Sequence, residues 1–225
     1  FVQRIEKYLN SKRKTLIGWD EILEGGLAPN AIVMSWRGEA GGIEAAKQKH
    51  QVIMTPGKPV YFDHSQSQHE DSVTIGGYNP IEAVYAYNPV PKELNTDEAK
   101  YVLGAQANVW TEYMNNSRKI EYMIFPRMAA LSEVLWSKNE NKSWEDFEKR
   151  LPVQMKRYDM MKWNYSRAYY EVDATVSPAQ DFNSITLKVK SRNPLLPIKV
   201  EEYLPATKDV EVAVYDSKGT IQNQE

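Results

Sequence analysis

Short, continuously apolar runs recur along the first half of the chain and predict strands. Continuous rather than alternating apolar sequence is typical of parallel strands that are buried on both faces. Apolar residues at helical spacing before and between these runs predict helices, the first with Val2, Ile5 and Leu9 on one stripe. The predicted strands are 15–18, 31–34, 51–54 and 101–109, the predicted helices are 1–10 and 42–50, and a long polar loop is expected from 58 to 97.

Two longer helices are predicted next, after which the pattern changes. Apolar residues lie along one stripe over 120–136 and again over 144–161, where Pro152 is expected to kink or split the helix. Beyond Ser166, apolar and polar residues alternate with a period of two over 184–190 and 210–215. This alternation predicts a small antiparallel β region.

The order of these elements predicts an α/β fold. Strands followed by helices favour parallel pairing through crossover connections. Each predicted strand ends in a tryptophan-containing or polar cluster, and the carboxyl ends of the strands form the active face of an eight-stranded β/α barrel. A whole barrel needs about 250 residues. We therefore expect residues 1–165 to form the C-terminal half of a TIM (β/α)8 barrel, and residues 166–225 to form a sandwich-like, β-rich accessory region that need not be complete.

Composition narrows the classes of function. The 225 residues carry a formal net charge of -2, so charge gives no case for nucleic acid as a partner. No apolar run approaches the roughly 20 residues of a membrane-spanning helix. The chain has no cysteine, which excludes disulfides and thiolate chemistry, and its three histidines are too irregularly spaced for a zinc motif. We expect neither a metal nor a cofactor. The 14 tyrosines and 6 tryptophans suit sugar binding, but they are also ordinary core residues.

Five segments, taken in order, resemble glycoside hydrolase family 20 β-N-acetylhexosaminidases. Each segment alone is weak evidence, but four lie at or after predicted strand ends and the fifth lies in the helix that follows them. The order and placement make the combined resemblance specific. The segments are Gly18-Trp19-Asp20-Glu21, Met34-Ser35-Trp36-Arg37, Tyr61-Phe62-Asp63, the stretch 104–112 with its Trp110-Thr111-Glu112, and 126–136 with Pro126-Arg127 and Glu133 to Trp136.

The resemblance implies removal of terminal β-linked N-acetylhexosamine with retention of configuration. Family members use no enzyme nucleophile, because the acetamido oxygen of the substrate attacks the anomeric carbon, an effect of proximity. By resemblance, Trp19 and Trp36 would enclose the acetamido group. The hydroxyl of Tyr61 would donate a hydrogen bond to the acetamido oxygen and orient it for attack.

Three further residues would bind the sugar ring by the same resemblance. Trp110 would stack under the pyranose, while Asp63 and Glu112 would accept hydrogen bonds from outer hydroxyls. Taken singly, each of the six candidates also fits an ordinary structural role in a core, at a surface, in a turn or at a helix start. We assign Arg127 and Glu133 to a structural ion pair or cap contact near the barrel rim. The remaining tryptophans, expected in the core, are Trp136, Trp144 and Trp163.

The catalytic carboxylates of the family are not expected in this chain. The family pair is an adjacent Asp-Glu in a glycine-rich context at the end of the fourth strand. Asp20-Glu21 instead follows Trp19, which matches the fifth strand, and Asp97-Glu98 lies in a polar loop. Since the chain starts within a predicted helix, we expect the pair, and an arginine of the first strand, upstream of Phe1. The chain alone is then predicted to be inactive.

Two other readings remain open from sequence. One is a non-catalytic N-acetylhexosamine-binding module, and the other is a β/α fragment without a ligand. The residues do not distinguish N-acetylglucosamine from N-acetylgalactosamine as the terminal sugar of an oligosaccharide or glycoconjugate. An open half-barrel has two unpaired edge strands, so a homodimer of the fragment is expected. The family resemblance favours a periplasmic, secreted or cell-surface location in a bacterium.

Overall fold

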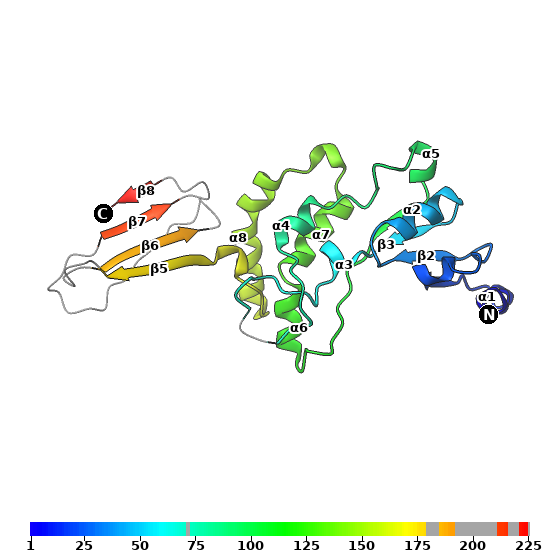
Figure 1. Cartoon of the computed structure of the whole chain (residues 1–225), viewed down its shortest axis with the longest axis horizontal. Helices are drawn as coiled ribbons and strands as arrows, with labels where there is room; N and C mark the ends of the chain where they lie inside the picture. The colour runs from blue at the N-terminus through cyan, green and yellow to red at the C-terminus, as the bar shows by residue number, and fades with distance from the viewer. Residues whose placement is uncertain (71–72, 179–184, 192–210, 216–220, 225) are drawn as a thin grey trace. The chain divides into compact units, whose positions relative to one another are not determined.

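In the computed structural model of the chain, the described residues form two compact units (Figure 1). The units are Phe1–Ser166 and Arg167–Glu225. The structure describes residues 1–70, 73–178, 185–191, 211–215 and 221–224. Among these residues, no helix is long and apolar enough to cross a membrane.

The first unit is built on a four-stranded parallel sheet with the strands in sequence order. Ile17 pairs with Ile32, Ser35 with Met54, and Met54 with Ala105. This arrangement confirms the parallel α/β fold expected from the continuous apolar runs. The strands are β1 (Ile17–Trp19), β2 (Ile32–Ser35), β3 (Val52–Met54) and β4 (Val102–Ala105).

Helix α2 (Ala40–Lys47) packs against β2 and β3 (Figure 1). The approach is close at Gly42, where a Cβ atom would lie only 2.5 Å from the sulfur of Met54, so a larger residue would have to displace the Met54 side chain. The Ser35 hydroxyl, at the end of β2, accepts a hydrogen bond from Gly42 N at 2.8 Å and donates one to Gly38 O at 2.7 Å. These bonds fix the turn between β2 and α2. The helix preceding the sheet is α1 (Val2–Ser11).

The segment expected as one long polar loop contains three short helices, so that expectation was wrong. Its polar composition hid the apolar residues Ile81, Val84 and Tyr85, which are buried on one side of α4. Asn95 caps α5 through a reciprocal capping box with Glu98. The helices are α3 (Gly57–Val60), α4 (Ile81–Ala86) and α5 (Thr96–Ala99).

The single helix expected over 120–136 is interrupted. Phe125 has extended dihedral angles (φ -95°, ψ 141°), and Pro126 lacks the N–H that a continuing helix would need. Two helices result, α6 (Ser117–Ile124) and α7 (Arg127–Trp136). By contrast, α8 (Trp144–Met161) continues through Pro152, and Ser143 caps its start by accepting a bond from Asp146 N.

Aromatic side chains hold α8 against the rest of the first unit. Tyr85 of α4 lies 4.7 Å from Phe147, and Phe125 stacks on Trp163 with ring centroids 4.9 Å apart. Trp144 joins this cluster at the edge of Tyr85, and Trp163 is partly exposed within it. The core assignment was wrong for Trp136, whose side chain is 92% exposed, and for Trp163, which is 39% exposed.

The second unit is a four-stranded sheet with a mixed, not purely antiparallel, topology. The β5–β6 and β7–β8 pairs are antiparallel, but β6 and β7 run parallel. The period-two pattern located two of its strands correctly, whereas alternation alone does not specify strand direction. The strands are β5 (Val172–Pro178), β6 (Ile185–Ser191), β7 (Glu211–Tyr215) and β8 (Ile221–Gln224).

Candidate functional site

A cavity of about 760 Å³ opens at the carboxyl ends of the parallel strands. Trp19 is the last residue of β1, and Trp36 directly follows β2. Tyr61 and Asp63 come from the segment after β3, and Trp110 and Glu112 from the segment after β4, so neighbouring strand ends build one site. The structure brings all six candidate residues to this cavity: Trp19, Trp36, Tyr61, Asp63, Trp110 and Glu112.

Three tryptophans form the aromatic part of the lining. The rings of Trp19 and Trp110 lie 6.1 Å apart and are inclined by 41°, so they present two surfaces at an angle. Trp110 is 42% exposed, which leaves its ring open to a ligand. The indole N–H of Trp36 donates to both carboxylate oxygens of Glu21, at 3.0 and 3.1 Å, which fixes the orientation of that ring.

The Asp20 carboxylate binds backbone N–H groups and does not line the cavity. It is 2% exposed, accepts hydrogen bonds from the backbone N–H groups of Trp36 and Arg37, and pairs with Arg37 Nε at 2.6 Å. Its neighbour Glu21 does line the cavity. Burial acts to raise the pKa of Glu21, but hydrogen bonds from its own backbone and from Trp36 hold that pKa below its usual value. The adjacent carboxylates therefore have different environments and different partners.

Tyr61 and Asp63 reach the cavity from a backbone segment that continues the sheet beyond β3. Phe62 N donates to Asn108 O at 2.8 Å, and Asn108 N donates to Val60 O at 3.0 Å. Asp63 is 4% exposed, and its Oδ1 atom has no hydrogen-bond partner among the described residues. Burial raises the pKa of Asp63. Asp63 lines the cavity, and a carboxylate is suited to accept a hydrogen bond from a hydroxyl group of a ligand.

Arg127 holds the wall that carries Asp63. Its side chain is fully buried, and its guanidinium donates to Phe62 O at 2.6 Å and to the carbonyls of His64 and Asn79, both at 3.0 Å. A further bond goes to Met123 O. Arg127 has a structural role, as the sequence predicted. Its side chain contacts backbone carbonyls and not a carboxylate, because the guanidinium fork can satisfy several acceptors at once.

Other residues also line the cavity, and sequence reasoning did not identify them as site residues. His64 follows Asp63 directly, and burial lowers its pKa. Gly77 packs against the His64 ring with φ 78°, a left-handed conformation that favours glycine, and a Cβ there would lie 2.6 Å from Nδ1. The position of His64 beside a motif residue was the one sequence signal available. The complete additional lining is Gly18, Glu21, Ile22, His64 and Ile75.

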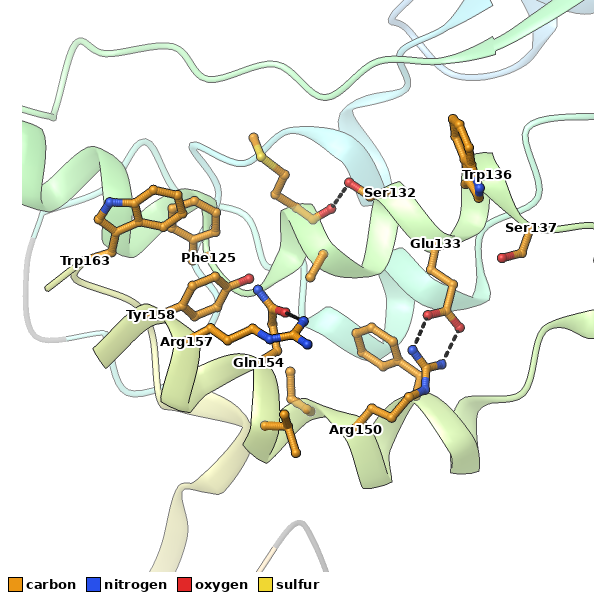
Figure 2. A pocket seen from close by; sticks show the side chains of 15 residues that line it. Phe125, Ser132, Glu133, Trp136, Ser137, Arg150, Gln154, Arg157, Tyr158 and Trp163 are labelled. Carbon is orange, nitrogen blue, oxygen red and sulfur yellow. Dashed lines mark hydrogen bonds and ion pairs between the residues drawn. The ribbon is translucent and has the colours of Figure 1, made fainter. Parts of the chain in front are cut away.

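A second cavity of about 620 Å³ lies in a groove between α7 and α8 (Figure 2). Glu133 crosses it to Arg150 through two contacts of 2.7 and 2.8 Å and also accepts a hydrogen bond from Tyr85. This confirms the structural ion pair expected for Glu133. Hydrogen bonds from Arg150 and Tyr85 hold the pKa of Glu133 below its usual value, although burial acts in the opposite direction. The groove contains none of the candidate site residues.

In the part of the chain that the structure describes, no group of three or more His, Cys, Asp or Glu side chains could hold a metal ion. The first cavity offers aromatic surfaces, a phenolic hydroxyl, the imidazole of His64 and carboxylates. Flat indole rings pack against the C–H faces of sugars, and ionised carboxylates accept strong hydrogen bonds from hydroxyl groups. These groups suit a carbohydrate ligand, and they lie on a β/α scaffold.

The comparisons with known proteins agree with this class. The family model described as "Glycosyl hydrolase family 20, catalytic domain" matches residues 1–139. A β-hexosaminidase of Porphyromonas gingivalis is 49% identical over 192 residues, which cover 84% of this chain and 24% of that protein. A β-hexosaminidase of Vibrio furnissii is 34% identical over 131 residues, which cover 56% of this chain and 21% of that protein. The chain thus spans about a quarter of the length of these relatives.

Comparison with solved structures indicates the same family. The exo β-N-acetylglucosaminidase of Vibrio harveyi, determined in complex with N-acetylglucosamine, matches with a TM-score of 0.68 and 28% identity. The match covers 74% of this chain and 27% of that one. The parallel sheet with its helices is therefore part of a TIM barrel of the glycoside hydrolase type. The chain belongs to glycoside hydrolase family 20, whose catalytic domain it contains in part.

Proposed function

We propose that this chain supplies the sugar-binding wall of an exo-acting β-N-acetylhexosaminidase. The observation that carries the proposal is the convergence of three tryptophans, Tyr61, Asp63 and Glu112 on one cavity at adjacent strand ends. The substrate is the terminal β-linked N-acetylglucosamine or N-acetylgalactosamine of an oligosaccharide or glycoconjugate. The ring of that sugar packs on Trp110, and its outer hydroxyls donate to Asp63 and Glu112.

The retaining mechanism needs the acetamido group folded back toward the anomeric carbon. Trp19 and Trp36 enclose the methyl end of that group, and the Glu21 carboxylate keeps the Trp36 ring in place. Tyr61 donates its hydroxyl proton in a hydrogen bond to the acetamido oxygen while that oxygen attacks the anomeric carbon. The bond between the anomeric carbon and the leaving oxygen breaks as the ring of an oxazolinium-like intermediate closes, and water later opens it with net retention.

The general acid and its partner aspartate are proposed to lie outside these 225 residues. Asp20 is buried, and both of its carboxylate oxygens already bind Arg37 or backbone N–H groups of the strand end. The isolated chain should then show no turnover of an aryl N-acetyl-β-glucosaminide, since general acid catalysis contributes on the order of 10² to 10⁴ in rate. Robust turnover by this chain that disappears in Glu21→Gln would assign the acid to Glu21 and overturn the proposal.

The decisive experiment is steady-state kinetics of the native protein with Tyr61→Phe on an aryl N-acetyl-β-glucosaminide. Loss of the hydroxyl should lower kcat more than it raises KM, because the hydrogen bond acts on the attacking oxygen in the transition state. Tyr113→Phe is a matched control, since Tyr113 lies near the site in sequence but is exposed and does not line the cavity. A change in KM alone would reduce Tyr61 to a binding residue.

The non-catalytic alternative gives a different result in the same assay. A pure binding module would bind N-acetylglucosamine in an equilibrium titration, and Trp110→Ala would weaken that binding. The native protein would nevertheless hydrolyse no aryl glycoside. Turnover of the aryl glycoside by the native protein, with a lower kcat in Tyr61→Phe, excludes that alternative.

A further inference from the structure

Asn108 and Tyr61 are direct neighbours across the sheet. They form an isolated parallel bridge beyond the ends of β3 and β4, with the two flanking backbone hydrogen bonds in place. Residues paired in this way project their side chains from the same face of a sheet. The Asn108 side chain therefore lies on the face from which Tyr61 reaches the cavity.

The Asn108 amide is buried and held at only one end. The residue is 7% exposed, and its Oδ1 accepts a hydrogen bond from Gln106 Nε2 at 3.0 Å. This bond assigns the oxygen to the side of Gln106 and leaves Nδ2 on the other side. Nδ2 has no hydrogen-bond partner among the described residues. A buried amide donor without a partner costs free energy, so its retention needs a reason.

The pKa of the Tyr61 hydroxyl links this residue to Asn108. Burial raises the pKa of the Tyr61 hydroxyl, while hydrogen-bonding interactions of Trp110 and Asn108 act to lower it. A donor lowers a phenol pKa when it points at the oxygen, because it stabilises the negative charge that develops there. Asn108 therefore lies close enough to the Tyr61 hydroxyl to lower its pKa.

We propose that Asn108 is a positioning residue that aims the Tyr61 hydroxyl. Its Nδ2–H approaches a lone pair of the phenolic oxygen, which leaves the Tyr61 proton free to be donated into the cavity. Gln106 keeps the amide in the required orientation. The inference rests on the proposed function for the role of Tyr61 toward substrate, but the pairing itself is a property of the protein alone.

The pairing is tested without any activity measurement. In native protein labelled with 13Cζ-tyrosine, Asn108→Leu should raise the pKa of Tyr61 further above its usual value, because the donor is lost while the burial remains. Asn115→Leu is the control, since Asn115 is exposed and outside the cavity lining. An unchanged Tyr61 pKa in a folded Asn108→Leu protein, as judged by its other tyrosine resonances, would overturn the proposal.

A double-mutant cycle tests the catalytic consequence. Asn108→Leu should lower kcat by about tenfold, the effect of one hydrogen bond of about 1.4 kcal/mol, with little change in KM. In the Tyr61→Phe background, the same substitution should change kcat by less than about twofold, because its target is gone. Asn108→Asp removes the donor and adds an acceptor that competes for the Tyr61 proton, so kcat should fall at least as far as in the leucine variant.

The outcomes separate the two proposals. Equal losses of kcat from Asn108→Leu in both backgrounds would mean that Asn108 acts directly on substrate or on folding, and would refute the positioning role. An Asn108-dependent Tyr61 pKa together with absent turnover by the native protein would retain the pairing and refute the proposed function.

Discussion

Replacement of Arg127 by methionine should destabilise the first unit and dismantle the Asp63 side of the cavity. Methionine preserves much of the buried volume but removes every donor. The carbonyls of Phe62, His64 and Asn79 would each lose their bond to the guanidinium. The carbonyl of Met123 would retain its bond from Gln66 Nε2 at 3.3 Å and is left out of the count.

The magnitude follows from those three carbonyls. A buried polar group left unpaired costs about 1–3 kcal/mol, so three cost about 3–9 kcal/mol before relaxation. Relaxation of the segment toward water should favour the low end, about 3–5 kcal/mol. At about 2–4 °C per kcal/mol for a domain of this size, Tm should fall by roughly 10 °C.

Thermal unfolding of the native protein, followed by calorimetry or circular dichroism, measures this directly. Arg157→Met is the matched control. Arg157 is exposed and, within the described part of the chain, its side chain bonds only to Gln154 Oε1, at 3.1 Å, so its loss should change Tm by about 1 °C or less. Arg127→Lys should remain destabilised, because one ammonium cannot reproduce the guanidinium fork. A Tm for Arg127→Met within about 2 °C of the parent would show that the carbonyls find other donors, and would refute the reasoning.

Three further predictions concern the site and the sheet edges. Trp110→Ala should weaken N-acetylglucosamine binding by about tenfold in calorimetric titration, and an unchanged affinity would remove Trp110 from the subsite. Burial raises the pKa of Asp63, so the folded state binds the carboxyl proton more tightly than the unfolded state does. The contribution of protonated Asp63 to the free energy of unfolding is therefore present below pH 3.8 and is lost as pH rises through the folded pKa. Asp63→Asn should flatten that part of the stability–pH curve, while sugar affinity in the parent should rise over the same interval as the carboxylate ionises. The 225-residue chain should self-associate at micromolar concentration in sedimentation, since Ile17 on β1 and Leu103 on β4 are exposed on the two edge strands, and a clean monomer would contradict this.

The sequence determined the parallel strands and the residues at their ends. Continuous apolar runs identify strands buried on both faces, and a tryptophan or a carboxylate directly after such a run must lie at the carboxyl edge of the sheet. This local logic placed Trp19 and Trp36 correctly without any knowledge of their neighbours. The separation of Asp20 from the family's catalytic aspartate came instead from the family resemblance, and it stays a prediction.

The tertiary structure decided which polar groups are buried and what they face. Arg127 and Trp136 lie on one short helix, yet the first is fully buried and the second is 92% exposed, because only one side of α7 packs on other elements. Nothing in the spacing of Asn108 and Tyr61 reveals that they are paired, since the contact joins segments far apart in sequence. The parallel pairing of β6 with β7 was not predicted from the sequence for the same reason. Strand ends are local properties of the chain, whereas burial and pairing arise only when distant segments pack together.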